Sequence, residues 1–168
     1  SFTKSETIAV TTIELSTTST ASIANGKVAV KETTVGESIS SGIASGSTKV
    51  YKYLSITKQN IKDSDLSKAK IAFEVPASWL NANDIDPNTV TLNRYVNSQW
   101  VALPTTRVKQ LNSKGYLYEA ETPGFSTFAI SGEASEKLTA FQLIDVIRGF
   151  YAGTSTYTAF DIIDKIRA

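Results

Sequence analysis

The chain has 168 residues, 41% of them hydrophobic and 20% charged, and its formal net charge is +1 at pH 7. This composition is typical of one ordinary globular domain, and at this length neither a metal nor a disulfide is needed for stability. Cysteine, histidine and methionine are absent from the sequence. Their absence excludes thiol catalysis, histidine-based triads and zinc sites built on thiolate or imidazole ligands.

The charge balance bears on partners, since 17 Lys and Arg residues stand against 16 Asp and Glu residues. A nucleic-acid-binding surface needs an excess of basic residues, so we expect no nucleic-acid partner. No apolar run approaches the roughly 18 residues that cross a bilayer, so we expect no membrane span in this chain.

Residues 1–48 are expected to form an N-terminal β-rich arm and Ser/Thr-rich strands. Ser and Thr supply 20 of these first 48 residues, a bias that recurs in exported surface proteins and that short polar residues on exposed strands explain equally well. Strands are expected at residues 6–15 and 27–35, and a loop at residues 38–47. In the first strand the apolar positions change phase from one pair, Ile8 and Val10, to another, Ile13 and Leu15. The phase change predicts a β-bulge or a strand buried on both faces.

Residues 49–132 are expected to form the core of a β-sandwich. One helical turn is expected at residues 78–83. The predicted strands of this region are residues 50–57, 71–75, 90–96, 100–103, 106–111, 116–121 and 127–130. Short strands separated by turn residues about every 8 to 12 positions are typical of antiparallel sandwiches. The predicted fold is therefore mainly β, an antiparallel, immunoglobulin-like β-sandwich of about nine strands with a C-terminal α-helical hairpin.

The hairpin is predicted at residues 138–168 from an internal repeat. The segment at residues 139–148 is echoed 19 residues later at residues 158–167. Each copy begins with a Thr at capping-box spacing and continues with apolar residues on one helical face. Two such short amphipathic helices must pack on each other, on the sandwich or on a neighbouring molecule.

Two acidic groups are candidates for chemistry. Asp84, Asp86 and Asn88 begin like a calcium-binding loop, but Thr89 replaces the required glycine, and we expect a turn whose side chains cap their own backbone. Glu119 and Glu121 share one face of a strand, roughly 7 Å apart, which suits a glycoside hydrolase. The alternating sequence around them fits a solvated sheet face better. We therefore assign no catalytic, cofactor-binding or metal-binding residues.

Aromatic side chains offer a further candidate site, since exposed rings on β-sandwiches often bind sugars. The more frequent role of strand aromatics is in the core or in cross-strand pairs. The candidate rings are Trp79, Trp100, Tyr51, Tyr53, Tyr95, Tyr116 and Tyr118.

A family resemblance covers about residues 50–132. The segments at residues 60–76, 85–95 and 118–130, which include the signature Thr122-Pro-Gly-Phe-Ser126, resemble the archaeal PGF-pre-PGF domain. That resemblance implies an extracellular, non-catalytic module of exported, often S-layer-associated or adhesin-like surface proteins. It brings no catalytic residue and no cofactor. Unlike that family's pattern, the signature here is followed by the helical repeat.

The resulting functional hypothesis is an extracellular archaeal structural or adhesive surface protein, not an enzyme, that self-associates into a filament or surface lattice. Residues 1–15 are expected to act as an arm that adds a strand to a neighbour's sheet, with Ile8, Val10 and Ile13 setting the register. The sequence leaves open whether this strand pairs within its own chain instead. Expected partners are further copies of the chain or other surface proteins. The alternative is a carbohydrate-binding β-sandwich module that uses Trp79 or Trp100.

Overall fold

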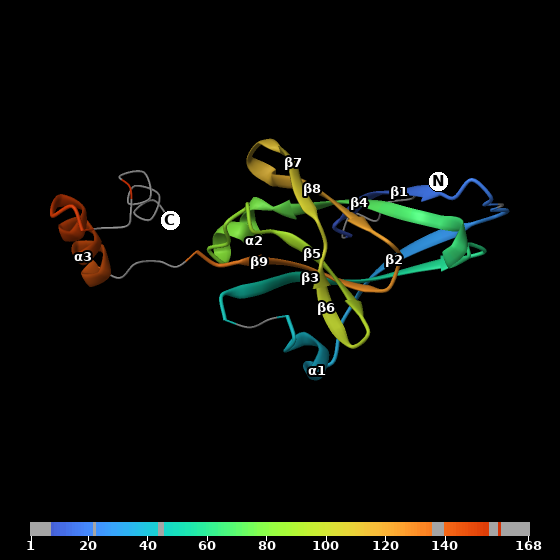
Figure 1. Ribbon diagram of the computed structural model, residues 1–168, viewed down its shortest axis with the longest axis horizontal. Coiled ribbons are helices and arrows are strands. Elements are labelled where there is room, and N and C mark those ends of the chain that lie inside the picture. The colour runs from blue at the N-terminus through green and yellow to red at the C-terminus, as the bar shows by residue number, and fades with distance from the viewer. Residues whose placement is uncertain (1–7, 22, 44–45, 136–139, 155–157, 159–168) are drawn as a thin grey trace. The chain divides into compact units, whose positions relative to one another are not determined.

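Strands make up about half of the described residues (Figure 1), and several of them, such as residues 66–76, alternate between buried and more exposed side chains. The structure is a computed structural model and describes residues 8–21, 23–43, 46–135, 140–154 and 158. Nine β-strands lie within these described residues, in antiparallel sheets of four and five strands. The predicted antiparallel, mainly β sandwich is confirmed.

The four-stranded sheet has the order β1-β4-β8-β7. Its strands are β1 (Val10–Thr17), β4 (Leu66–Pro76), β8 (Gly115–Thr122) and β7 (Thr105–Gln110). Along β4 the side chains of Ile71, Phe73 and Val75 are fully buried, whereas those of Ala72 and Glu74 between them are half-buried. This period of two places the apolar residues on the inner face of the sheet.

The five-stranded sheet has the order β2-β3-β9-β5-β6. Its strands are β2 (Lys27–Thr33), β3 (Thr48–Gln59), β9 (Thr127–Glu133), β5 (Thr91–Val96) and β6 (Gln99–Ala102). The central strand β9 is buried on both faces, because Phe128, Ala129 and Ile130 point to alternate sides and none is exposed.

The core lies between the inner faces of the two sheets. Phe73 of β4 stacks on Tyr118 of β8 with ring centroids 5.5 Å apart. Burial of one large apolar side chain stabilises the fold by roughly 1.5 to 3 kcal/mol. The other large, fully buried side chains are Phe128, Leu54, Ile56, Ile71, Leu80, Leu92, Ile130, Val10 and Val75.

Short helices connect the strands. The helix α2 (Ala77–Ala82) follows β4 and confirms the predicted helical turn. The helix α1 (Glu37–Ser40) lies partly within residues 38–47, where a loop was expected. Two 3-10 turns, η1 (Asp63–Asp65) and η2 (Asn112–Lys114), precede β4 and β8.

Strand β1 decides between the two pairings left open for the described part of residues 1–15, because it pairs within its own chain and not with a neighbour. Residues 10–17 pair with β4 of the same chain, and Val10 is fully buried. The predicted bulge is confirmed as a register shift between Val10 and Thr12. Residues 1–133 cluster as one unit, so β1 and β2 belong to the same sandwich as residues 49–132. The difference arises because β1 finds an unpaired edge within its own sheet.

Residues 134–168 form a second unit. Its described helix α3 (Ala140–Tyr151) corresponds to the first helix of the predicted hairpin, and Asp145 pairs with Arg148 at 3.6 Å, as the i,i+3 spacing predicts. Gly153, with φ of +68°, ends the helix, and its amide donates to the Phe150 carbonyl. The predicted second helix lies outside the described residues.

Candidate functional site

One side of the sandwich is open between the edge strands β1 and β2, both blue in Figure 1. We call this region the seam. It holds a cleft of about 680 Å³, lined by residues of β1, β2, β3 and the turn that precedes β2. The lining residues are Ile13, Leu15, Asn25, Gly26, Lys27, Val28, Ala29, Thr57 and Gln59.

The turn at Asn25 and Gly26 shapes one end of the seam. Asn25 adopts a positive φ of 55°, and its carbonyl accepts a hydrogen bond of 3.2 Å from the Asn60 side-chain amide. A Cβ on Gly26 would lie 2.5 Å from the Ile23 side chain and 2.9 Å from that of buried Ile61. Only glycine fits this position without a shift of its neighbours.

The predicted carboxylate pair lies on the outer face of the four-stranded sheet. Glu119 and Glu121 share that face, as their spacing predicts, but each contacts a lysine of β4. Lys70 lies 3.3 Å from Glu119, and Lys68 lies 2.7 Å from Glu121. The hydrogen bond and charge of Lys68 lower the pKa of Glu121 below its ordinary value. The general acid of a glycosidase needs the opposite shift, which comes from an apolar site.

The candidate aromatic residues are divided among separate sites and do not form one platform. Tyr118 is in the core, and Tyr51 lies against Trp79 of α2 with centroids 5.1 Å apart. Tyr53 and Tyr95 flank Trp100 at 6.0 and 5.1 Å. Partial burial raises the pKa of both Tyr51 and Tyr53.

Trp100 holds α1 to the five-stranded sheet. Its indole N–H donates a hydrogen bond of 2.7 Å to the Ile39 carbonyl. A Cβ on Gly42 would lie 3.4 Å from the indole ring, so the segment after α1 also approaches the ring closely. This geometry favours packing as the role of Trp100 over stacking on a sugar.

The predicted turn at residues 84–88 is confirmed. A carboxylate oxygen of Asp86 accepts hydrogen bonds from the backbone amide of Asn88 at 2.8 Å and from its side-chain amide at 2.9 Å. This side chain therefore caps its own backbone, as an Asx turn does. Within the described residues, no group of three or more acidic side chains is arranged to hold a metal ion.

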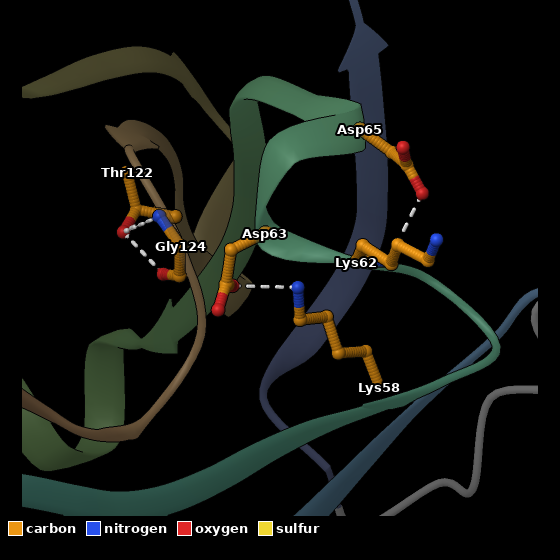
Figure 2. A network of polar contacts seen from close by, with 6 residues as sticks. All are labelled: Lys58, Lys62, Asp63, Asp65, Thr122 and Gly124. Atoms are coloured by element: carbon orange, nitrogen blue, oxygen red, sulfur yellow. Dashed lines mark hydrogen bonds and ion pairs between the residues drawn. The ribbon is translucent and has the colours of Figure 1, made fainter. Parts of the chain in front are cut away.

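A polar cluster lies where β3 crosses to the other sheet through η1 (Figure 2). Lys58 contacts a carboxylate oxygen of Asp63 at 2.6 Å, which lowers the pKa of Asp63. The carboxylate of Asp65 accepts the backbone N–H of Lys62 at 3.1 Å. These contacts fix the crossing between the sheets.

The signature at residues 122–126 connects β8 of one sheet to β9 of the other. Figure 2 shows Thr122 turned back onto Gly124, where its hydroxyl donates a hydrogen bond of 2.7 Å to the glycine carbonyl. Arg94 of β5 contacts this loop, because its Nε donates a hydrogen bond of 3.3 Å to the Ser126 hydroxyl. A Cβ on Gly124 would lie 3.2 Å from the Arg94 guanidinium. The signature thus builds a tight loop, and the part played by Arg94 has no signal in the sequence.

The fold and these sites define a β-sandwich protein with an open seam. Comparison of the chain with protein family models, with curated proteins and with solved structures finds no match. In the described part of the chain, none of the helices has both the length and the apolar character needed to cross a membrane.

Proposed function

We propose that this chain is an extracellular structural or adhesive protein of an archaeal cell surface, which self-associates through β-strand and apolar contacts. The observation that carries this proposal is the seam, where the edges of β1 and β2 flank a cleft lined in part by Ile13, Leu15 and Val28. Exposed strand edges pair with other chains through main-chain hydrogen bonds, and alternate side chains give specificity.

Three further features support a non-catalytic surface role. The resemblance over residues 50–132 implies an exported archaeal module, and the Ser/Thr-rich N-terminal region has the composition of exported proteins. The carboxylates best placed for hydrolysis, Glu119 and Glu121, contact Lys70 and Lys68. Such ion pairs keep a carboxylate charged, which suits a solvated face better than proton donation.

Light scattering and negative-stain electron microscopy of the purified full chain test the assembly. We expect filaments or sheets that grow with protein concentration. Monomers at every concentration would contradict self-association. Protease shaving of intact source cells tests the location, and recovery of its peptides only after lysis would contradict a surface role.

The alternative function is a carbohydrate-binding module, and the half-buried pair of Tyr51 and Trp79 favours it. Its partly exposed rings lie beside the Lys52 ammonium, which is 5.6 Å from the centre of the Tyr51 ring. A glycan array distinguishes the two functions. Binding that is lost in Trp79→Ala and kept in Trp100→Ala would establish the sugar site, and a blank array would leave self-association as the better explanation.

A further inference from the structure

The edge of β2 is long and regular, although it carries Lys27 and Lys31, and lysines are among the features that protect a sheet edge. Its seven residues pair with β3 in an unbroken register, with no bulge and no proline. By contrast, β6 has only four residues, and β7 carries a register shift between Arg107 and Lys109. Short strands, bulges and basic side chains discourage edge pairing. Because lysines also protect an edge, β2 is the best suited of these three edges for a strand that carries negative charge. The fourth edge, β1, is regular over residues 12–16, between its two register shifts.

The two strands at the seam run in opposite directions. Thr17, at the end of β1, pairs with Leu66 at the start of β4, and Lys27, at the start of β2, pairs with Gln59 at the end of β3. Residues 60–65 join β3 to β4, so these four residues lie toward the same end of the sandwich. Rotation by 180° about an axis parallel to the strands would place β1 of one copy antiparallel to β2 of another.

The outer faces of these strands carry opposite charge. Glu14 is the only charged residue of β1, and it is exposed on that strand's outer face. Lys27 and Lys31 are exposed on the corresponding face of β2. Among the described residues, none of these three side chains has an ion-pair partner. The cleft lies between Ile13 and Leu15 on one side and residues 27–29 on the other, so Glu14 and Lys27 are at a similar level along the seam.

We propose that the seam is the interface of a two-fold symmetric dimer, in which β1 of each copy pairs with β2 of the other. This inference rests on the proposed self-association and names its interface. The pairing joins the four-stranded sheet of one copy to the five-stranded sheet of the other, twice. Such an interface is isologous and closed, so growth of these dimers into a filament or sheet requires contacts through another surface.

The dimer brings together apolar residues that the single chain leaves half-buried. Ile13, Leu15 and Val28 line the cleft of each copy. Apposition of the two seams joins both clefts into one interior that is part apolar and part polar, and removal of its apolar surface from water favours association. The main-chain groups at the edges of β1 and β2 gain hydrogen-bond partners at the same time.

Sedimentation velocity of the full chain and two charge-reversal variants tests the dimer. Glu14→Lys and Lys27→Glu each place like charges across both halves of the interface, so each variant should raise the dimer dissociation constant by at least about tenfold. An equal mixture of the two variants restores both charge pairs in a heterodimer, and dimers should reappear. The same charge change at the opposite edge, Lys109→Glu, is the control and should leave dimerisation unchanged.

The outcomes separate this interface from self-association in general. Variants that associate as well as the parent chain would overturn the seam dimer and leave self-association through another surface. A parent chain that stays monomeric would overturn both. Seam-dependent dimers that never grow into filaments or sheets would support the dimer and contradict only the larger assembly. Circular dichroism melting curves that match the parent chain's show that the exposed substitutions leave the fold intact.

Discussion

The Tyr118 hydroxyl donates a hydrogen bond of 2.8 Å to the Pro87 carbonyl, while its ring stacks on Phe73 in the core. The side chain therefore ties β8 to the turn that precedes β5, with its apolar ring inside the core and its polar end satisfied. Buried tyrosines are stable in this arrangement because the hydroxyl keeps a partner. Burial also raises the pKa of Tyr118 to about 12.

We expect Tyr118→Phe to lower the free energy of unfolding by about 1 kcal/mol at neutral pH, because it removes one hydrogen bond. In the parent chain, the unfolded state loses the tyrosine proton near pH 10, whereas the folded state keeps it until about 12. The free energy of unfolding of the parent chain therefore falls as pH rises between these values. Tyr118→Phe has no phenol at this position, so its stability lacks this pH dependence.

Urea unfolding of both proteins at about pH 8 and about pH 11 measures the effect. The parent should lose stability between these pH values because its Tyr118 ionises more readily in the unfolded state, whereas the variant has no phenol at this position. The difference in the free energy of unfolding between parent and variant should therefore be smaller at the higher pH. A difference that stays constant with pH would show that the Tyr118 phenol ionises alike in the folded and unfolded states.

Gly115 occupies a position where the backbone leaves no room for a side chain. Its φ is +143°, and a Cβ there would overlap the Val75 carbonyl oxygen and lie 2.8 Å from the Cα of Pro76. We expect Gly115→Ala to destabilise the protein by about 3 kcal/mol or more, because the obstructing atoms belong to the backbone. Thermal unfolding measures this loss. In the control Gly36→Ala, the added methyl has nothing within 4 Å, and a change within about 0.5 kcal/mol is expected.

Much of this fold is encoded in short-range pattern. Ile71, Phe73 and Val75 alternate with Lys70, Ala72 and Glu74, and this alternation alone indicates a strand with one buried face. The phase change between Val10 and Ile13 likewise predicted a bulge at its observed place. Patterns of this kind succeed because the strand period and the position of the core together fix which residues are buried.

The sequence pattern does not show which strands pair with each other. Nothing local distinguishes a strand that pairs with its own sheet from one that pairs with a neighbour, so the sequence leaves both pairings open for β1. The sequence does not predict the seam either, because the seam depends on which strands lie at the edges of the two sheets. The spacing of Glu119 and Glu121 correctly placed them on one face, but the lysines beside them lie about fifty residues away in the chain.

The ion pair with Lys68 controls the pKa of Glu121, which a single substitution can test. Lys68→Met removes the hydrogen bond and the charge that lower the Glu121 pKa, so this pKa should rise toward its ordinary value. Carboxyl NMR titration follows the change directly. Lys109→Met removes a lysine that has no contact with Glu121 among the described residues, and it should leave the titration unmoved. An equal shift in both variants would mean that general surface charge, not this pair, sets the pKa.

The contact between Trp100 and Ile39 predicts the local stability of α1. Trp100→Phe keeps an aromatic ring beside Tyr53 and Tyr95 but removes the indole N–H, which leaves the Ile39 carbonyl without its donor at 2.7 Å. We expect a loss of about 1 kcal/mol, and amide hydrogen exchange in α1 should accelerate about fivefold, because the helix is short and its attachment is weakened.

Hydrogen exchange followed by mass spectrometry measures this change in the peptide that covers residues 36–43. The matched variant is Trp79→Phe, which alters the aromatic pair with Tyr51 and leaves the hydrogen bond between Trp100 and Ile39 in place. Its α1 amides should exchange at the parent rate. If both variants loosened α1 equally, the cause would be a general loss of sandwich stability, and the indole hydrogen bond would have no special part in holding α1 against the sheet.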